Sequence, residues 1–163
     1  MSLVVEDGTG IQNANTYISL ADVSSYCLNF DFEDFFSKLE AEQNALILKS
    51  MRFIESFDFV GTKNQTENNL QWPRDDAYER NGLLIDSGTI PGNIKDAVCE
   101  GVMLEVSSSG ILQPSLSRQG LKSEQYGDVK FEYFSSGKTS PSFATISGLL
   151  VGLVKSSHVI MRS

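Results

Sequence analysis

The stretch EAEQNALILKSMRFIESF, residues 40–57, decides the fold because it carries the clearest helical periodicity in the chain. Its apolar residues recur every three or four positions, on two neighbouring lines: Ile47, Met51 and Ile54, and then Leu46, Phe53 and Phe57. This spacing is typical of a long helix with a broad apolar face. We therefore predict a helix over residues 40–57 that buries this face against another element.

A second helical pattern, NIKDAVCEGVMLEV, follows Pro91 and supplies a matching surface. Pro91 suits the first turn of a helix, where its missing N–H has no cost. The apolar side of the pattern consists of Ile94, Ala97, Val98, Gly101 and Val102. Ala97 and Gly101 are small and four residues apart, so another helix can approach closely there. We predict that the helix over residues 91–106 packs against the helix over residues 40–57.

The remaining pattern completes a mainly α domain. A short helix is predicted over residues 20–28, because Ser19 and Asp22 have the spacing of a capping box. The chain has 163 residues, of which 40% are hydrophobic, which suits one domain with a real core. We predict a small helical bundle with a long internal loop and a C-terminal β-hairpin or extended arm.

Residues 58–90 contain many polar residues and glycines and are expected to form a loop that projects from a helical body spanning residues 1–106. This loop holds the only tryptophan, Trp72, directly before Pro73. One reading buries Trp72 in the core, where it pins the loop. The other makes Trp72, Arg74, Tyr78 and Arg80 a protein–protein interface, because Trp, Tyr and Arg dominate binding hot spots. Both can hold if Trp72 pins the loop and the other three face a neighbour.

Residues 107–163 are expected to form a linker, a β-hairpin and a docking arm. A Ser/Gly-rich start is followed by alternation at Val129, Phe131 and Tyr133, next to a turn at residues 126–128, which predicts a hairpin over residues 122–134. Two strands alone are marginal in water, so these three residues are candidate interface residues that a neighbour would complete. The apolar end, residues 143–154, could be a last short helix or an extended arm.

Charge is distributed unevenly along the chain. The net charge is −8, which repels phosphate backbones and anionic lipid headgroups. Residues 1–60 carry ten acidic and three basic side chains, whereas residues 107–163 carry three acidic and six basic ones. An acidic body and a basic tail favour contacts between surfaces, including copies of this chain. The N-terminal residues lack a basic region and the longest apolar tract is too short to cross a bilayer, so we expect an intracellular protein without membrane contact.

Histidine and cysteine, the residues most used in catalytic and metal sites, are scarce in this chain. The single histidine, His158, is near the end, and Cys27 and Cys99 have no C-x-x-C spacing and are expected to be buried free thiols. We therefore predict no enzyme, no cofactor and no metal. An acid–base enzyme using Asp75 or Asp76 is a remote alternative, because adjacent carboxylates diverge and are usually solvated.

The order of several motifs resembles a family of tailed-phage proteins that are labelled DnaT-like single-stranded DNA-binding proteins and are encoded among head-completion genes. The motifs, in order, are VEDGTG, ANTYISLADVSSY, LQWPRDDAYERNGLLI, IPGNIKDAVCE and GLKSEQYGDVKFEY. The resemblance covers about residues 3–133, and the QWPR and IPGNIKDAVCE blocks are its most specific part. The last thirty residues match least.

Two functions follow from this resemblance. The gene context implies a structural head-to-tail adaptor in the virion neck, assembled in the host cytoplasm as a ring, commonly of about twelve copies, between portal and tail proteins. DNA would then pass through the lumen without sequence-specific binding. The alternative is the function in the label, single-stranded DNA binding. The negative charge argues against that alternative, because single-strand binders combine a positive groove with stacking aromatics, and we therefore take the adaptor as the leading hypothesis.

Overall fold

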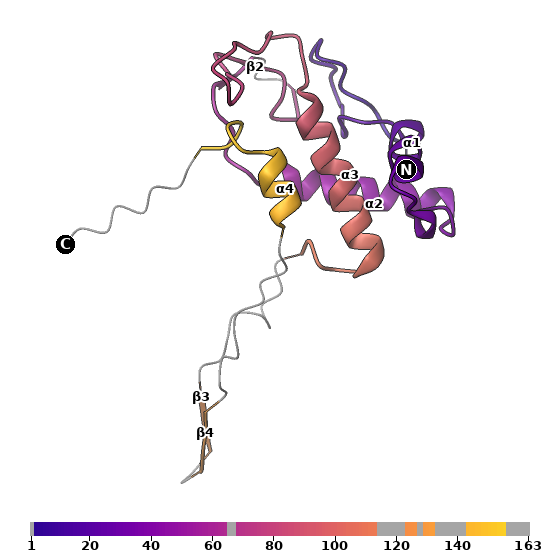
Figure 1. The fold of residues 1–163 in the computed structure, drawn as a ribbon, viewed down its shortest axis with the longest axis vertical. Helices are drawn as coiled ribbons and strands as arrows, with labels where there is room; N and C mark the ends of the chain where they lie inside the picture. The colour runs from indigo at the N-terminus through magenta and orange to yellow at the C-terminus, as the bar shows by residue number, and fades with distance from the viewer. Residues whose placement is uncertain (1, 65–67, 114–122, 127–128, 133–142, 156–163) are drawn as a thin grey trace, which may run out of the picture.

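The computed structural model describes residues 2–64, 68–113, 123–126, 129–132 and 143–155 (Figure 1). It is mainly helical, with two small antiparallel strand pairs, which confirms the predicted fold class. The elements in chain order are α1 (Leu20–Asn29), the 3-10 turn η1 (Glu33–Phe35), α2 (Glu40–Ile54), β1 (Thr62–Lys63), β2 (Arg74–Asp75), α3 (Gly92–Ser107), β3 (Ser123–Tyr126), β4 (Val129–Glu132) and α4 (Ala144–Leu149).

The centre of the molecule is the packing of α2 against α3, as the two periodic patterns predict (Figure 1). Side chains on the facing sides, such as Ile47, Ile54, Ile94 and Val98, are completely buried. The helices meet closely at Gly101, where an added Cβ would lie 2.2 Å from Ser50 Oγ of α2. Helix α2 ends at Ile54, three residues before the predicted end, and the chain continues in tight turns.

Helix α1 begins with the predicted capping box. The Ser19 side chain accepts a hydrogen bond from Asp22 N, and the Asp22 carboxylate accepts one from Ser19 N. Cys27 of α1 and Cys99 of α3 are both buried free thiols, as predicted, and burial raises the pKa of each. The thiols therefore stay protonated and contribute to the packing between these two helices.

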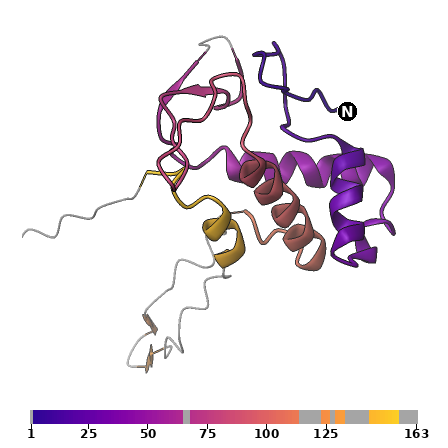
Figure 2. The same ribbon diagram turned by 45° about the horizontal axis from the view of Figure 1, so that its top comes forward.

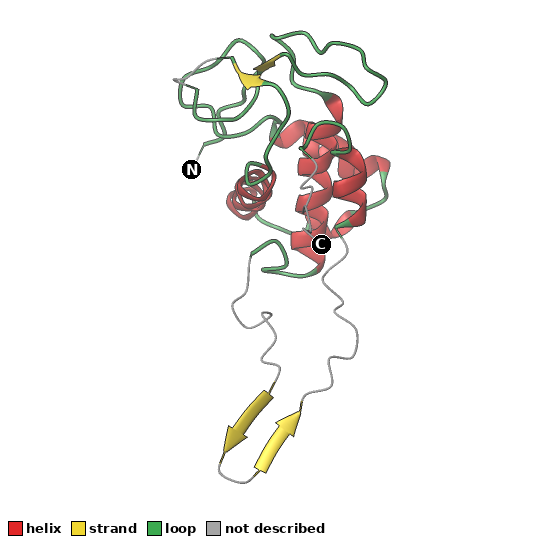
Figure 3. Ribbon diagram, turned by 90° about the vertical axis from the view of Figure 1, so that its left-hand side faces the viewer, coloured by secondary structure: helices red, strands yellow, loops and turns green. Residues whose placement is uncertain are grey.

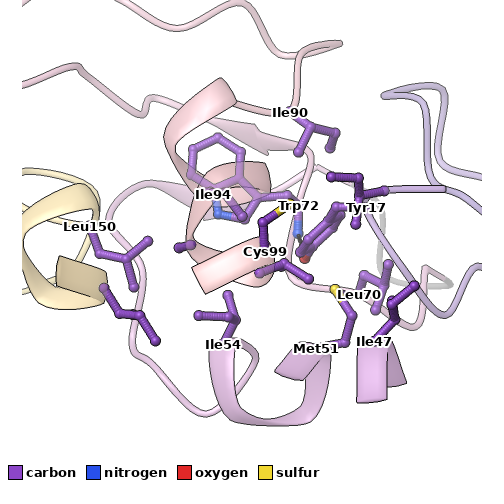
Figure 4. Packing of buried hydrophobic residues seen from close by; sticks show 14 of the residues in the cluster. Tyr17, Ile47, Met51, Ile54, Leu70, Trp72, Ile90, Ile94, Cys99 and Leu150 are labelled. Carbon is purple, nitrogen blue, oxygen red and sulfur yellow. Dashed lines mark hydrogen bonds between the residues drawn. The ribbon is translucent and has the colours of Figure 1, made fainter. Parts of the chain in front are cut away.

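The segment from residue 143 to residue 155 belongs to the folded body, which corrects the expectation of a docking arm there. Ile146 and Leu150 are buried against the core, and α4 packs on α3 (Figures 1 and 4). Beyond α4 the chain returns to the end of the α2 connection, where Val60 N donates to Leu153 O at 2.9 Å and Lys155 N donates to Asp58 O at 2.8 Å. Lys155, one of the basic residues of the C-terminal part, also forms an ion pair with Asp58.

The predicted hairpin is present as the antiparallel pair β3–β4 (Figure 3). Its register pairs Tyr126 with Val129 and Glu124 with Phe131. The candidate interface residues Val129 and Phe131 are therefore in β4, whereas Tyr133 lies outside the described residues. The expectations for residues 114–122, 133–142 and 156–163, including His158, also fall outside them. Within the described ranges, none of the helices has both the length and the hydropathy needed to span a bilayer.

Candidate functional site

Trp72 is buried in the core and fixes the connection between α2 and α3 to the helices (Figure 4). Its ring packs edge-on against Phe59, with ring centroids 6.0 Å apart. The peptide bond to Pro73 is cis. The connection does not project as a whole, because Leu70, Trp72, Ala77, Ile85 and Ile90 are all buried, and β1 pairs with β2 inside it.

A buried polar network holds the main chain at this tryptophan. The Tyr17 hydroxyl accepts a hydrogen bond from Trp72 N at 3.0 Å and donates one to the Glu55 carboxylate. The other Glu55 oxygen accepts from Gln71 N at 2.9 Å. Burial raises the pKa of Glu55, although the hydrogen bonds from Tyr17 and Gln71 oppose that shift. Sequence reasoning missed Tyr17 and Glu55, because partners so far apart along the chain leave no local signal.

Arg74 is not a surface residue, which corrects its assignment to an exposed interface. Arg74 is 7% exposed, and its guanidinium donates hydrogen bonds to the main-chain carbonyls of residues 59–61 and of Gln71. The closest are Val60 O at 2.7 Å from Nε and Gly61 O at 2.9 Å from Nη2. These carbonyls follow directly after the buried Phe59, so Arg74 supplies hydrogen bonds that the irregular main chain would otherwise lack.

Tyr78 and Arg80 are exposed, as the interface reading requires, and they lie beside a groove of about 830 Å³. One wall of the groove is the turn at residues 79–86, its floor is the start of α3, and the other wall is the chain at residues 148–153. Tyr78 is 50% exposed, and its main chain forms a β-bridge with that of Leu84 across the turn. The Arg80 guanidinium has no ion-pair partner within the described part of the chain.

Local hydrogen bonds and one glycine shape the groove. The turn is closed by Glu79 N to Leu83 O at 2.8 Å and by Leu83 N to Asn81 Oδ1 at 2.9 Å. Across the groove Gly152 has a φ of +88°, and an added Cβ would lie 3.2 Å from Arg80 Cα. Only glycine combines that backbone conformation with so close an approach. The two walls are therefore fixed relative to each other.

Large exposed apolar side chains of the described residues form two groups at different ends of the body. One group belongs to the groove region: Leu84 and Val151 line the groove, and Tyr78 and Leu83 are sequence neighbours of lining residues in the same turn. The other lies between α1 and α2 and consists of Leu28, Phe30, Phe36 and Leu39. In Figure 2, α1 and the start of α2 are on one side of the body and α4 is on the other. The molecule thus has two separate surfaces where a bound partner would shield exposed apolar side chains from water.

Metal-ligating side chains do not cluster in the described residues. Within these ranges, no three His, Cys, Asp or Glu side chains gather where they could hold a metal ion. Asp75 is half-buried and its carboxylate accepts a hydrogen bond from Asn64, whereas the adjacent Asp76 is exposed and has a φ of +53°. The two carboxyl groups therefore have different surroundings, as expected for adjacent residues.

A family model described as "Putative DnaT-like ssDNA binding protein" matches residues 1–163, the whole chain. The chain belongs to this family. The match includes the last thirty residues, where the resemblance of the motifs is weakest. No curated protein and no solved structure gives a significant match.

Membership of the DnaT-like family overturns the leading functional hypothesis. The head-to-tail adaptor, its ring of copies, its portal and tail partners, and DNA passing through a lumen were inferred from gene context, and that inference is wrong in the light of the family match. The family's description agrees instead with the alternative, single-stranded DNA binding.

Proposed function

We propose that this protein binds single-stranded DNA. The observation that carries the proposal is the family match over the whole chain. Single-strand binders need a groove, aromatic or apolar side chains that contact bases, and cations that contact phosphates. In the described part of the chain these three features coincide at the groove beside Tyr78 and Arg80.

The groove has the chemistry for a base and its neighbouring phosphate. Leu84 and Val151 line the groove with exposed apolar surface. The exposed Tyr78 directly precedes the lining residue Glu79 and bridges to Leu84, so a base held in the groove can stack or pack there regardless of its identity. Arg80 is exposed next to them and can contact a phosphate. The volume of about 830 Å³ is within the usual range for ligand pockets.

The two carboxylates of the groove accept hydrogen bonds from neighbouring residues of the same turn. Glu79 accepts a hydrogen bond from Asn81 at 3.0 Å, and Asp86 accepts one from Gly88 N at 2.8 Å. With two acids and one arginine the groove is net negative, so long-range attraction to phosphates does not contribute and contact with bases must supply the affinity. Further cations are available in the sequence of residues 107–163, which holds six basic side chains.

The test is binding of fluorescein-labelled oligo(dT), followed by fluorescence anisotropy over a range of salt concentrations. We expect Tyr78→Ala to weaken binding by about 1–3 kcal/mol, the contribution of one stacked base. Arg80→Ala should make the negative slope of log affinity against log salt shallower by about 0.7, the value for one lost phosphate contact.

Lys38→Ala is the matched control, because Lys38 is an exposed cation on the other apolar surface and should leave binding unchanged. A labelled duplex tests strand specificity and should bind more weakly than the single strand. Equal affinity for the duplex, or no binding of either at low salt, would refute the proposal. The absence of catalysis and a place in the virion stay predictions that are separate from this test.

A further inference from the structure

The second apolar surface, between α1 and α2, exposes large side chains without any use in the proposed DNA binding. Leu28 is 66% exposed, Phe30 58%, Phe36 42% and Leu39 73%. Leu28 and Phe30 lie at the end of α1, Phe36 at the end of η1 and Leu39 at the start of α2, and α1 contacts both η1 and α2, so the four side chains lie on neighbouring elements. Contiguous exposed apolar surface of this kind marks interaction sites in soluble proteins.

Leu39 is the clearest sign that this surface has a role beyond folding. It is the N-cap residue of α2, and its side chain makes no capping hydrogen bond. Ser, Thr, Asp or Asn at that position would accept a hydrogen bond from the helix, and leucine is among the least suited residues there. An exposed leucine that both loses a cap and meets water gives the fold no benefit, and such local conflicts are expected at functional positions.

The patch is rigid because each exposed aromatic ring rests on another one. Phe30 packs on Tyr26 with ring centroids 4.7 Å apart, and Phe36 packs edge-on against the buried Phe35 at 5.7 Å. The Gln43 side chain also donates to Phe35 O at 3.0 Å, which ties η1 to α2. A rigid aromatic surface loses little conformational entropy when a partner binds.

Charge decides which partner fits. Residues 28–42 contain five acidic side chains, all exposed, and one basic side chain: Asp31, Glu33, Asp34, Glu40 and Glu42, against Lys38. This local excess of negative charge repels nucleic acid and anionic lipid, and it attracts cations. A partner must therefore present apolar side chains for the patch and basic side chains for its rim.

We propose that the surface formed by residues 28–42 binds a basic amphipathic helix of another protein. The helix would lay its apolar face on Leu28, Phe30, Phe36 and Leu39 and direct lysines or arginines toward the surrounding carboxylates. Electrostatic complementarity speeds the encounter and sets specificity, while burial of the apolar side chains supplies affinity. Since this surface lies apart from the groove, the protein could hold DNA and a protein partner at the same time.

The experiment uses a labelled synthetic peptide of leucine and lysine, with the leucines on one face of a helix, and the full-length protein. A second peptide of identical composition but scrambled order is the control for charge alone. We expect the amphipathic peptide to bind at least about tenfold more tightly than the scrambled one. The double variant Leu28→Ser, Leu39→Ser should lose that preference.

The matched control variant is Leu83→Ser, Leu84→Ser, which removes equally exposed leucines beside the groove and should keep the preference. Folding of all variants is checked by thermal unfolding. Leu39→Ser should not harm it, since it supplies the missing N-cap and completes a capping box with Glu42.

Two results would overturn the proposal. One is equal binding of the amphipathic and scrambled peptides. The other is a wild-type dimer in sedimentation that Leu28→Ser, Leu39→Ser abolishes, because the patch would then be covered by a second copy of this chain. DNA binding is measured in parallel and should be unaffected by this variant, so the two proposals can fail independently.

Discussion

Trp72 joins the long connection between α2 and α3 to the core through its ring and its main chain together. The ring is completely buried, and its N–H donates to no acceptor within the described part of the chain. The contribution of the side chain is therefore mainly apolar contact, whereas the main-chain N–H is held by Tyr17.

We predict that Trp72→Ala lowers the free energy of unfolding by about 3–5 kcal/mol, as truncation of large buried aromatics does. Trp72→Phe should cost clearly less, because it keeps most of the apolar contact and removes an N–H that has no acceptor. Urea unfolding of both variants measures the difference. If the two substitutions cost the same, apolar burial is not the main contribution of the side chain.

Individual residues show where sequence reasoning reached its limit. Burial of Trp72 could be predicted because a large aromatic rarely stays exposed. The role of Arg74 could not, since its carbonyl acceptors at residues 59–61 are brought to it only by the tertiary fold. Tyr78 and Arg80 were singled out by residue type alone, and the groove beside them depends on residues 148–153, which are distant in sequence.

At the scale of elements, the contact of α2 with α3 depends on the absence of a side chain at Gly101. An added Cβ would lie 2.2 Å from Ser50 Oγ and 3.2 Å from Ser50 Cβ. The Ser50 hydroxyl also donates to Val98 O of α3 at 2.7 Å, so it cannot move without losing a buried hydrogen bond. Periodicity in the sequence predicted this close approach correctly.

We predict that Gly101→Ala destabilises the protein. Overpacking costs about 1–3 kcal/mol, and the gain of up to about 1 kcal/mol in helix propensity does not offset it. In a Ser50→Ala background the same change should cost less, because the nearest atom is gone. A double-mutant cycle by chemical denaturation measures this coupling, and simple additivity of the two substitutions would contradict the proposed clash.

The elements α2 and α3 could be predicted because each repeats its pattern over several turns. Helix α4 is short and its surroundings contain Gly148 and Gly152, so the sequence left a helix and an extended arm equally open. Its contact with α3 joins segments that are far apart in sequence, so no local pattern predicts it. The prediction of an arm rested on charge and composition. In the structure Ile146 and Leu150 are buried, so this segment is part of the body.

For the whole molecule, the half-buried Glu55 and the buried Glu105 give stability opposite dependences on pH. Burial raises the pKa of Glu55 above its ordinary value of 4.5, so its contribution is present below that value and is lost as pH rises through the raised pKa. Burial also acts to raise the pKa of Glu105, but hydrogen bonds from Gly110 N and Lys49 outweigh it, and the pKa is lowered. The contribution of Glu105 is therefore lost as pH falls through that lowered pKa.

We predict that Glu55→Gln reduces the decline in stability as pH rises from about 4.5 toward neutrality, because the substituted amide does not titrate. Glu105→Gln should instead reduce the loss of stability on acidification. The free energy of unfolding in urea, measured at several pH values, gives both slopes. Unchanged slopes in the two variants would assign the pH dependence to other groups.

The return of the chain to Asp58 and Val60 after α4 anchors the chain that follows the β3–β4 hairpin to the body. Because both Gln113 and Phe143 belong to the folded body, the β3–β4 hairpin is carried by an insertion with two attached ends, not by a free tail. The entropy of closing such a loop grows only with the logarithm of its length, and doubling the length costs about 0.6 kcal/mol. The body can therefore accept large changes in the length of this insertion while its own fold remains the same, which makes the insertion a suitable place for the chain to gain or exchange a module.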